Sequence, residues 1–568
     1  MSNFSIPRNV IPKESVDHLQ SLQEKQKGFP RTQFSGVTFF LILFWQGLIA
    51  TGLAQTPVSR RLTDGYPRQP AFDVLHYNLS LTVSDNSNVV RGKTIITVHR
   101  LDPTDTTLAL DLKNMTVTAL QVGHVTGKYV QRDGRLDVVL PAGRGRDDTL
   151  LLAIQYHGEP ADGLYLRENK FRRRTIFADN WPDRARYWFP GIDHPYDKAT
   201  VEFHITVPER HTVVATGRLE QERHNLDGTK TWSWRESVPI PTYCMVFGAA
   251  EFSVLHFGEV MNIPVSYYVF PGDAAVAEQS FGRTEQILQF FSNRIGPYPY
   301  EKLALVQSLT RFGAMENASA IFFAEAALGA RRTEGTSVHE IAHQWFGDSI
   351  TKADWHHLWL SEGFATYFDA LFYEDVEDEV SFREEMRRNR DDYLKFARTK
   401  LRPILDTTVT DYFDLLNANN YQKAGWVLHM LRHLIGTESF WQGIRDYYRA
   451  FKNGNALTDD FRRIMERVSG EELGWFFQQW LWQPGHPVIK WDWRWLPREK
   501  SVELMIRQLQ TGTFFRLPLE IEILSAGEKT RYDFWMERSE VNLKVPQDKK
   551  PEQIVLDPDE KILMEVLE

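Results

Sequence analysis

Residues 339–343 read HEIAH, and residues 360–365 read LSEGFA. Positions i and i+4 of an α-helix lie on one face, so His339 and His343 can reach the same metal ion. Neutral imidazole suits zinc, and a tetrahedral catalytic zinc takes three protein ligands and keeps one position open. We therefore expect a nearby carboxylate as the third ligand. Glu362 fits, because the 18 residues between it and His343 allow a turn and a second helix packed on the first.

Two more carboxylates belong to this pattern. Glu340 lies between the two histidines in sequence and projects toward the site without having to bind the ion. Asp369 stands seven residues after Glu362, on the same helix face. It either orients a zinc-binding histidine as a hydrogen-bond acceptor or is an ordinary surface carboxylate.

A second short motif precedes the histidines. It reads Gly313-Ala314-Met315-Glu316-Asn317 and ends 22 residues before His339. Its two small residues allow a substrate backbone to approach closely. The Glu316 carboxylate can then pair with a cationic group of that substrate. The alternative for this motif is a loop with a solvated glutamate.

The hydrophobic pattern changes twice along the chain. Apolar and polar residues alternate from about 73 to 254, as in Val201, Phe203 and Ile205, which indicates half-buried strands. Helical spacing dominates from about 257 to 483, and alternation returns near the end of the chain. We predict an α+β multidomain protein with an N-terminal antiparallel β domain, a mainly helical catalytic domain and a small C-terminal β-sandwich domain. The predicted segments are 1–60, 61–256, 257–484 and 485–568.

Together these motifs carry a family resemblance. GAMEN, then HEIAHQWFGD, then LWLSEGFATYF resemble the zinc aminopeptidases of the M1 (gluzincin) family. The family pattern is GxMEN, HExxH, eighteen residues and Glu, and this chain matches it without a gap. The resemblance is strongest from about 298 to 367 and extends more loosely from 188–195 to 475–481. It implies a thermolysin-like catalytic domain with one zinc ion per chain.

The resemblance also implies roles for particular residues. The zinc ligands would be the three residues named above, and Glu340 would be the general base for the attacking water. The segment 421–425 reads YQKAG and is similar to the family's YxKG-like stretch, so Tyr421 would donate a hydrogen bond to the oxyanion. Tyr412 is the competing candidate. Packing of Tyr421 on its own helix is the structural alternative.

Substrate binding is implied in the same way. Glu316 would bind the free α-amine of the peptide, which favours cleavage at the N-terminus. Many relatives supply a second amine-binding group from the β domain, but here Trp181 occupies the place of that Glu or Gln. Asn180 and Asp179 are the neighbouring candidates. For the pair His356-His357, local packing competes with a secondary metal site.

The composition excludes some classes of protein. Lys plus Arg total 66 against 75 Asp plus Glu, giving a net charge of −9, which argues against a nucleic-acid partner. The single cysteine, Cys244, excludes an intrachain disulfide or a Cys-rich zinc module. The apolar stretch 37–54 predicts export, either as a signal peptide cleaved after Ala54 or as an uncleaved anchor. Only the anchor would place the protein at a membrane.

We therefore expect a zinc-dependent aminopeptidase that acts on peptides with a free N-terminus. One alternative is an epoxide hydrolase-type activity on the same zinc site, known for a branch of this fold family. Another is a catalytically silent interaction protein, and a third is an endopeptidase. The pattern leaves the oligomeric state and the preferred N-terminal residue open.

Overall fold

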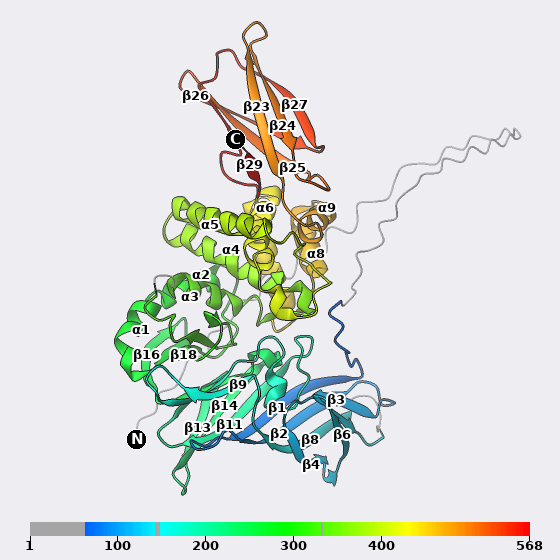
Figure 1. Ribbon diagram of the computed structural model, residues 1–568, viewed down its shortest axis with the longest axis vertical. Helices are drawn as coiled ribbons and strands as arrows, with labels where there is room; N and C mark the ends of the chain where they lie inside the picture. The colour runs from blue at the N-terminus through cyan, green and yellow to red at the C-terminus, as the bar shows by residue number, and fades with distance from the viewer. Residues whose placement is uncertain (1–62, 143–147, 331–332, 568) are drawn as a thin grey trace, which may run out of the picture. The chain divides into compact units, whose positions relative to one another are not determined.

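The computed structural model describes residues 63–142, 148–330 and 333–567, all within one compact unit (Figure 1). The predicted leader, including residues 37–54, lies outside the described residues. In the part of the chain that the structure describes, no helix is both long enough and apolar enough to cross a bilayer.

The N-terminal region consists of β-sheets, drawn in blue and cyan in Figure 1. The largest has eight strands in the order β13 (Arg218–His224), β14 (Thr229–Ile240), β11 (Ala199–Pro208), β1 (Phe72–Thr82), β2 (Val90–Arg100), β8 (Asp148–Gly158), β4 (Thr116–Val122) and β5 (Val125–Thr126). Two smaller sheets have the orders β3 (Thr107–Asp111), β7 (Arg135–Val139), β6 (Lys128–Arg132) and β12 (Thr212–Ala215), β15 (Phe247–Ala250), β10 (Arg174–Ala178), β9 (Leu164–Glu168).

The predicted alternation matches the burial of these strands. Along β11, buried and half-buried residues alternate at every position, and Val201, Phe203 and Ile205 are fully buried. One pairing in the large sheet differs from the antiparallel expectation, because β1 runs parallel to β11. In this sheet β2, β8, β4 and β5 lie on one side of β1, and the chain then crosses over so that β11 pairs with the other side of β1. Alternation alone cannot reveal the direction of such a neighbour, since both pairings have the same side-chain period.

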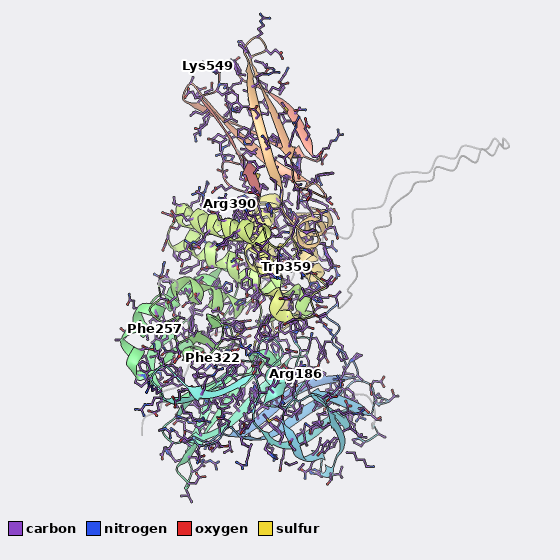
Figure 2. All side chains as sticks on the ribbon, in the orientation of Figure 1. Arg186, Phe257, Phe322, Trp359, Arg390 and Lys549 are labelled. Carbon is purple, nitrogen blue, oxygen red and sulfur yellow. The ribbon has the colours of Figure 1, made fainter. Side chains whose placement is uncertain are left out.

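The region that carries the metal-site motifs begins with another sheet. Its order is β16 (Ser253–Val260), β17 (Ile263–Val269), β18 (Leu303–Ser308), β20 (Ala320–Ala324) and β19 (Ala314–Met315), and the predicted border at 256/257 falls inside β16. Phe322 on β20, labelled in Figure 2, is buried. A small parallel pair joins β21 (Ile350–Lys352) and β22 (Gly454–Ala456).

The first two helices of this region lie between β17 and β18 in sequence, and the others follow β20. They are α1 (Ala274–Phe281), α2 (Thr284–Arg294), α3 (Thr333–His343), α4 (Trp359–Val376), α5 (Glu379–Ala397), α6 (Ala424–Ile435), α7 (Thr437–Phe451), α8 (Thr458–Ser469) and α9 (Gly474–Phe477). Helix α4 is central, packs against α3, α5 and α6, and is buried over most of its length. Trp359 at its start is fully buried (Figure 2).

The closest approach of α4 to α6 depends on a glycine. A Cβ atom placed on Gly363 would lie 2.5 Å from the Cβ of Ala424, which real side chains do not allow. The absence of a side chain at residue 363 therefore lets the two helices meet almost backbone to backbone. This contact brings the segment just before α6 beside the start of α4.

The C-terminal region is again made of strands. One sheet has the order β27 (Glu540–Pro546), β24 (Ser501–Gln508), β23 (Val488–Leu496), β29 (Glu565–Leu567), and the other has the order β26 (Glu528–Met536), β25 (Leu517–Ser525), β28 (Gln553–Leu556). The alternation expected near the end of the chain includes β25, where Leu517, Leu519, Ile521 and Ile523 are all buried. The predicted α+β class, with β-rich regions on either side of a helical one, is confirmed.

Candidate active site

Three side chains meet at the junction of α3 and α4. The Nε2 atoms of His339 and His343 lie 3.1 Å apart. The Oε2 atom of Glu362 lies 3.3 Å from the first and 3.2 Å from the second. A zinc ion with bonds of about 2.0 Å places neighbouring tetrahedral ligands about 3.3 Å apart. The three edges of this triangle match that spacing, so these residues fit zinc.

The His343 ring is oriented by contacts at its Nδ1 atom, on the side opposite the Nε2 atom that faces the metal site. Its Nδ1 atom lies 3.0 Å from the backbone oxygen of Phe346 and 3.2 Å from the hydroxyl of Ser361. A proton on Nδ1 leaves the Nε2 lone pair free for the ion. Neither partner was singled out from the sequence. A backbone carbonyl has no sequence signature, and a serine next to Glu362 has no distinguishing spacing.

Asp369 lies apart from this arrangement. Among the described residues, no hydrogen bond joins Asp369 to His339 or His343. It faces Gly335 in the first turn of α3, and its buried Oδ1 atom has no hydrogen-bond partner in the described parts of the chain. The structure therefore places Asp369 in the same cavity as the metal ligands but does not bring it to their imidazoles.

The site concentrates negative charge. Ligating atoms of Glu316, Glu340 and His343 all lie within 4.8 Å of one another. Burial raises the pKa of both glutamates, and the Glu362 carboxylate raises both further. Glu316 also raises the pKa of Glu340. Burial would lower the pKa of His343, but the surrounding carboxylates, Glu362 foremost, raise it to about 10. Because several carboxylates surround the two histidines, the site favours binding of a cation.

A cavity of about 1110 Å³ opens onto these residues. Besides the residues of the metal triangle and Glu340, its lining includes Trp181, Phe312, Gly313, Ala314, Met315, Glu316, Glu334, Gly335, Thr336, Asp369, Tyr373, Glu385, Arg388, Asn389, Asp392, Leu416, Asn417, Ala418, Tyr421 and Gln422. Of the GAMEN motif, Asn317 alone is absent from this lining. Its side chain is fully buried, and neither polar atom has a partner among the described residues.

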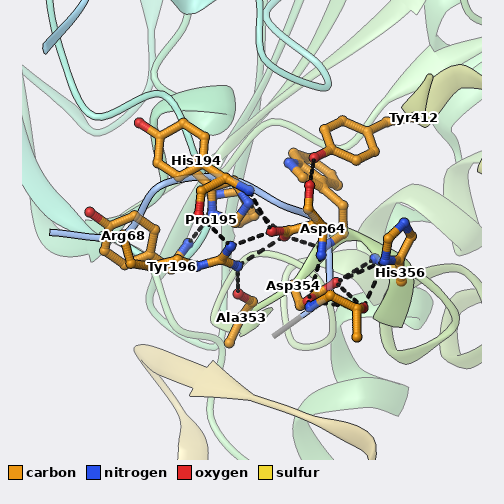
Figure 3. A network of polar contacts seen from close by, with 12 residues as sticks. Asp64, Arg68, His194, Pro195, Tyr196, Ala353, Asp354, His356 and Tyr412 are labelled. Carbon is orange, nitrogen blue, oxygen red and sulfur yellow. Dashed lines mark hydrogen bonds and ion pairs between the residues drawn. The ribbon is translucent and has the colours of Figure 1, made fainter. Parts of the chain in front are cut away.

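Tyr421 and Tyr412 have different surroundings. The ring of Tyr421 lines the cavity and stacks on His339 with ring centroids 6.0 Å apart. Burial, and next the Glu362 carboxylate, raise the pKa of Tyr421 well above its usual value, so its hydroxyl keeps its proton. Tyr412 instead donates to the backbone oxygen of Asp64 over 3.0 Å and stacks on Trp355 (Figure 3). Only Tyr421 is brought to the metal triangle.

Glu316 lies just after β19, which runs along the cavity. The residue is 4% exposed, and its Oε1 atom has no hydrogen-bond partner among the described residues. A buried carboxylate oxygen without a partner is costly unless a ligand supplies a donor. Glu316 is therefore available to a cationic group of a bound molecule.

The two candidates next to Trp181 for binding the substrate amine, Asn180 and Asp179, make other contacts. Asn180 donates to the backbone oxygens of Thr242 and Met245 at 3.1 and 2.9 Å and accepts from the Trp188 indole at 2.8 Å. Asp179 forms a buried ion pair of 2.9 Å with Arg184. The structure brings neither side chain into the lining of the cavity.

The paired histidines 356 and 357 are also committed to local contacts. His356 lies 2.8 Å from the hydroxyl of Thr63 and 2.8 Å from the backbone oxygen of Val409 (Figure 3). His357 lies 2.8 Å from the hydroxyl of Thr458. These contacts agree with local packing rather than a second metal site.

Two models of known protein families match the sequence. The model of the Peptidase M1 N-terminal domain matches residues 74–244, and that of the Peptidase family M1 domain matches residues 279–480. Between them they match more than half of the chain. The chain belongs to peptidase family M1. The resemblance inferred from the motifs is thus confirmed, and with it zinc as the metal of this site.

Individual relatives of this M1 chain differ in length. A glutamyl aminopeptidase of Rattus norvegicus is 28% identical over 389 residues, which cover 64% of this chain and 40% of that protein. An M1 zinc metallopeptidase of Deinococcus radiodurans is 26% identical, with a TM-score of 0.66 over 75% of this chain and 97% of the other. A mutant of the Deinococcus enzyme was solved with a Tyr-Ser-Ala substrate. The chain spans less than half the length of the curated relatives it matches.

Proposed function

We propose that this M1 chain is a zinc-dependent aminopeptidase that hydrolyses the N-terminal bond of peptides. His339, His343 and Glu362 would hold the ion. When bound, zinc polarises the scissile carbonyl and lowers the pKa of a water molecule toward neutrality. The solved complex of the related Deinococcus enzyme with a tripeptide supports a peptide as the substrate.

The chain's own side chains supply the remaining chemistry. Glu340 takes the proton from the attacking water and later delivers it to the departing amine, which balances the two proton transfers. Tyr421 keeps its proton and donates a hydrogen bond to the oxygen that becomes negative at the tetrahedral carbon. Its stacked position on His339 places the phenol beside the metal triangle.

One observation carries the exopeptidase assignment. The unpartnered Glu316 oxygen lies in the same cavity as the metal triangle, and the carboxyl group is within 4.8 Å of Glu340 and His343. An α-ammonium group paired with Glu316 would therefore bring the first peptide bond, and not a later one, to the ion. A peptide without a free N-terminus would leave Glu316 buried and unpaired.

The test compares blocked and free substrates on the zinc-loaded full chain. We expect hydrolysis of alanyl or leucyl p-nitroanilides and of short free peptides, no hydrolysis of their N-acetyl forms, and loss of activity in Glu340→Gln. Equal cleavage of acetylated peptides would establish an endopeptidase instead. Zinc-loaded protein that cleaves no peptide refutes the proposal, and turnover of a lipid epoxide in that case would favour the epoxide hydrolase alternative.

A further inference from the structure

An aromatic wall borders the cavity beside the amine-binding end. Trp181, which is 1% exposed, meets Phe312 edge to face with ring centroids 5.8 Å apart, and both residues line the cavity. Phe413 supports them from behind, 5.5 Å from Trp181 and stacked on Phe312 at 6.3 Å. Phe312 stands only four residues before Glu316, so the wall and the amine-binding carboxylate belong to one short segment.

Asp179 fixes the two halves of this wall relative to each other. One of its oxygens accepts from the backbone nitrogen of Arg311 and the hydroxyl of Thr310, both at 3.3 Å, next to Phe312. The other pairs with Arg184, whose Nε donates to the backbone oxygen of Trp181 over 2.6 Å. Asp179 is thus a positioning residue for the wall, although it does not line the cavity.

The cations near this end are already paired. The guanidinium groups of Arg184 and Arg311 both bind Asp162, at 2.9 and 2.8 Å, and neither residue lines the cavity. Arg388 does line it, but its guanidinium pairs with Glu385 at 2.6 Å. Apart from the metal-binding histidines, the described lining therefore offers no unpaired cation to an acidic side chain.

We propose that this wall receives the side chain of the first residue of the substrate and selects apolar, above all aromatic, residues there. This inference rests on the aminopeptidase function proposed above. Apolar groups gain from contact with the rings of Trp181 and Phe312, and from the neighbouring Met315 and Leu416 in the same lining. A carboxylate at this position would be desolvated beside aromatic rings and Glu316, with no unpaired cation in the described lining to balance its charge. The specificity differs from the one expressed in the names of the glutamyl aminopeptidase relatives.

The experiment measures kcat/KM of the zinc-loaded full chain for phenylalanyl, leucyl, alanyl and glutamyl reporter amides. We expect the phenylalanyl and leucyl amides to exceed the glutamyl amide by about 100-fold, a ratio within the range that pocket contacts achieve. In Phe312→Ala, the ratio of phenylalanyl to alanyl rates should fall about tenfold, and Phe312→Leu should restore part of it. Using a ratio removes any general effect of the variant on catalysis. Phe257→Ala, an exposed phenylalanine of β16, is the matched control and should not change the ratio (Figure 2).

The outcomes separate the two proposals. If no amide is cleaved by protein that holds zinc, the aminopeptidase function itself fails. If amides are cleaved but the glutamyl amide is preferred, or the phenylalanyl-to-alanyl ratio is unchanged in Phe312→Ala, only the assignment of the wall is overturned. A crystal structure with free phenylalanine seated away from Trp181 and Phe312 would overturn it as well.

Discussion

The side-chain amide of Gln344 donates to the backbone carbonyl oxygen of Glu316 over 2.7 Å. Its oxygen accepts from the backbone nitrogen of Ser319 at 2.8 Å, and its nitrogen also reaches Asp348 at 3.0 Å. One fully buried side chain just after the helix of His339 and His343 thus holds both ends of the turn that carries Glu316. The metal ligands and Glu316 are therefore positioned by a shared contact.

Replacing Gln344 by leucine should loosen this link. Both the Ser319 nitrogen and the Glu316 carbonyl would lose a buried partner, which costs about 1–3 kcal/mol of unfolding free energy for each group left unsatisfied. We expect a higher KM for free peptides together with an unchanged zinc content, because the substitution leaves the three metal-binding side chains in place. Urea unfolding, steady-state kinetics and metal analysis test this. Gln289→Leu on the exposed face of α2 is the control, and an equal rise in KM there would argue against a positioning role.

Glu340→Gln should separate chemistry from metal binding. The amide keeps the shape of the carboxylate but cannot take a proton, so kcat should fall by about 10²–10⁴-fold. Zinc should remain bound at one ion per chain, since the three ligands are untouched. Metal analysis of the purified variant, alongside kcat, provides both readouts. Full activity in this variant would contradict the role given to Glu340.

The two tyrosines give a matched pair of variants. Tyr421→Phe should lower kcat by about 10²–10³-fold, the usual cost of removing one oxyanion donor, with a smaller effect on KM. Tyr412→Phe removes only the hydrogen bond to the Asp64 carbonyl and should cost about 1 kcal/mol of stability without lowering kcat. Steady-state kinetics on both variants distinguish them. The reverse ranking would move the oxyanion role to Tyr412.

Removing zinc should destabilise the fold as well as stop catalysis. The ion binds the folded triangle and not the unfolded chain, so it adds about 2.7 kcal/mol when free zinc is 100 times its Kd. Without it, Glu316, Glu340 and Glu362 crowd one another around the histidines. We expect a chelator to lower the Tm and zinc to restore it. His343→Ala should show little response to the chelator, and an equal response would place the stabilising ion elsewhere.

Asp197 should make the stability of the fold depend on pH. Burial raises the pKa of its carboxyl group to about 8, far above the value in an unfolded chain. The folded state then holds a proton that the unfolded state has lost, so the unfolding free energy should fall as pH rises from about 4 to 8, by about 1.4 kcal/mol per unit at most. Asp197→Asn should remove this slope. Urea unfolding at pH 5, 7 and 9 tests it, and parallel curves for the two proteins would contradict it.

The sequence and the structure agree where spacing alone carries the information. The i, i+4 histidines, and the carboxylate separated from the second by 18 residues, could be placed because helical periodicity fixes their face, and the structure closes the triangle. Gln344 and the Phe346 carbonyl could not be predicted, because their role depends on which backbone atoms lie opposite after folding. Asp179 was a candidate because it is polar and lies close to Trp181 in sequence. In the folded protein its carboxylate is directed toward the Arg184 side chain and the Arg311 backbone nitrogen instead. No local pattern distinguishes that orientation from one facing the cavity.

The contact between Gly363 and Ala424 has a consequence for how the enzyme can change over evolutionary time. Glu362 precedes the first of these residues by one position, and Tyr421 precedes the second by three. A Cβ atom at residue 363 would push the two backbones apart and carry the phenol away from the metal triangle. The position of the Tyr421 hydroxyl relative to the metal triangle therefore depends on the absence of a Cβ atom at Gly363. Divergence at this junction should be confined to the smallest side chains, while the aromatic wall that lines the same cavity as Tyr421 can vary its bulk and so its choice of substrate.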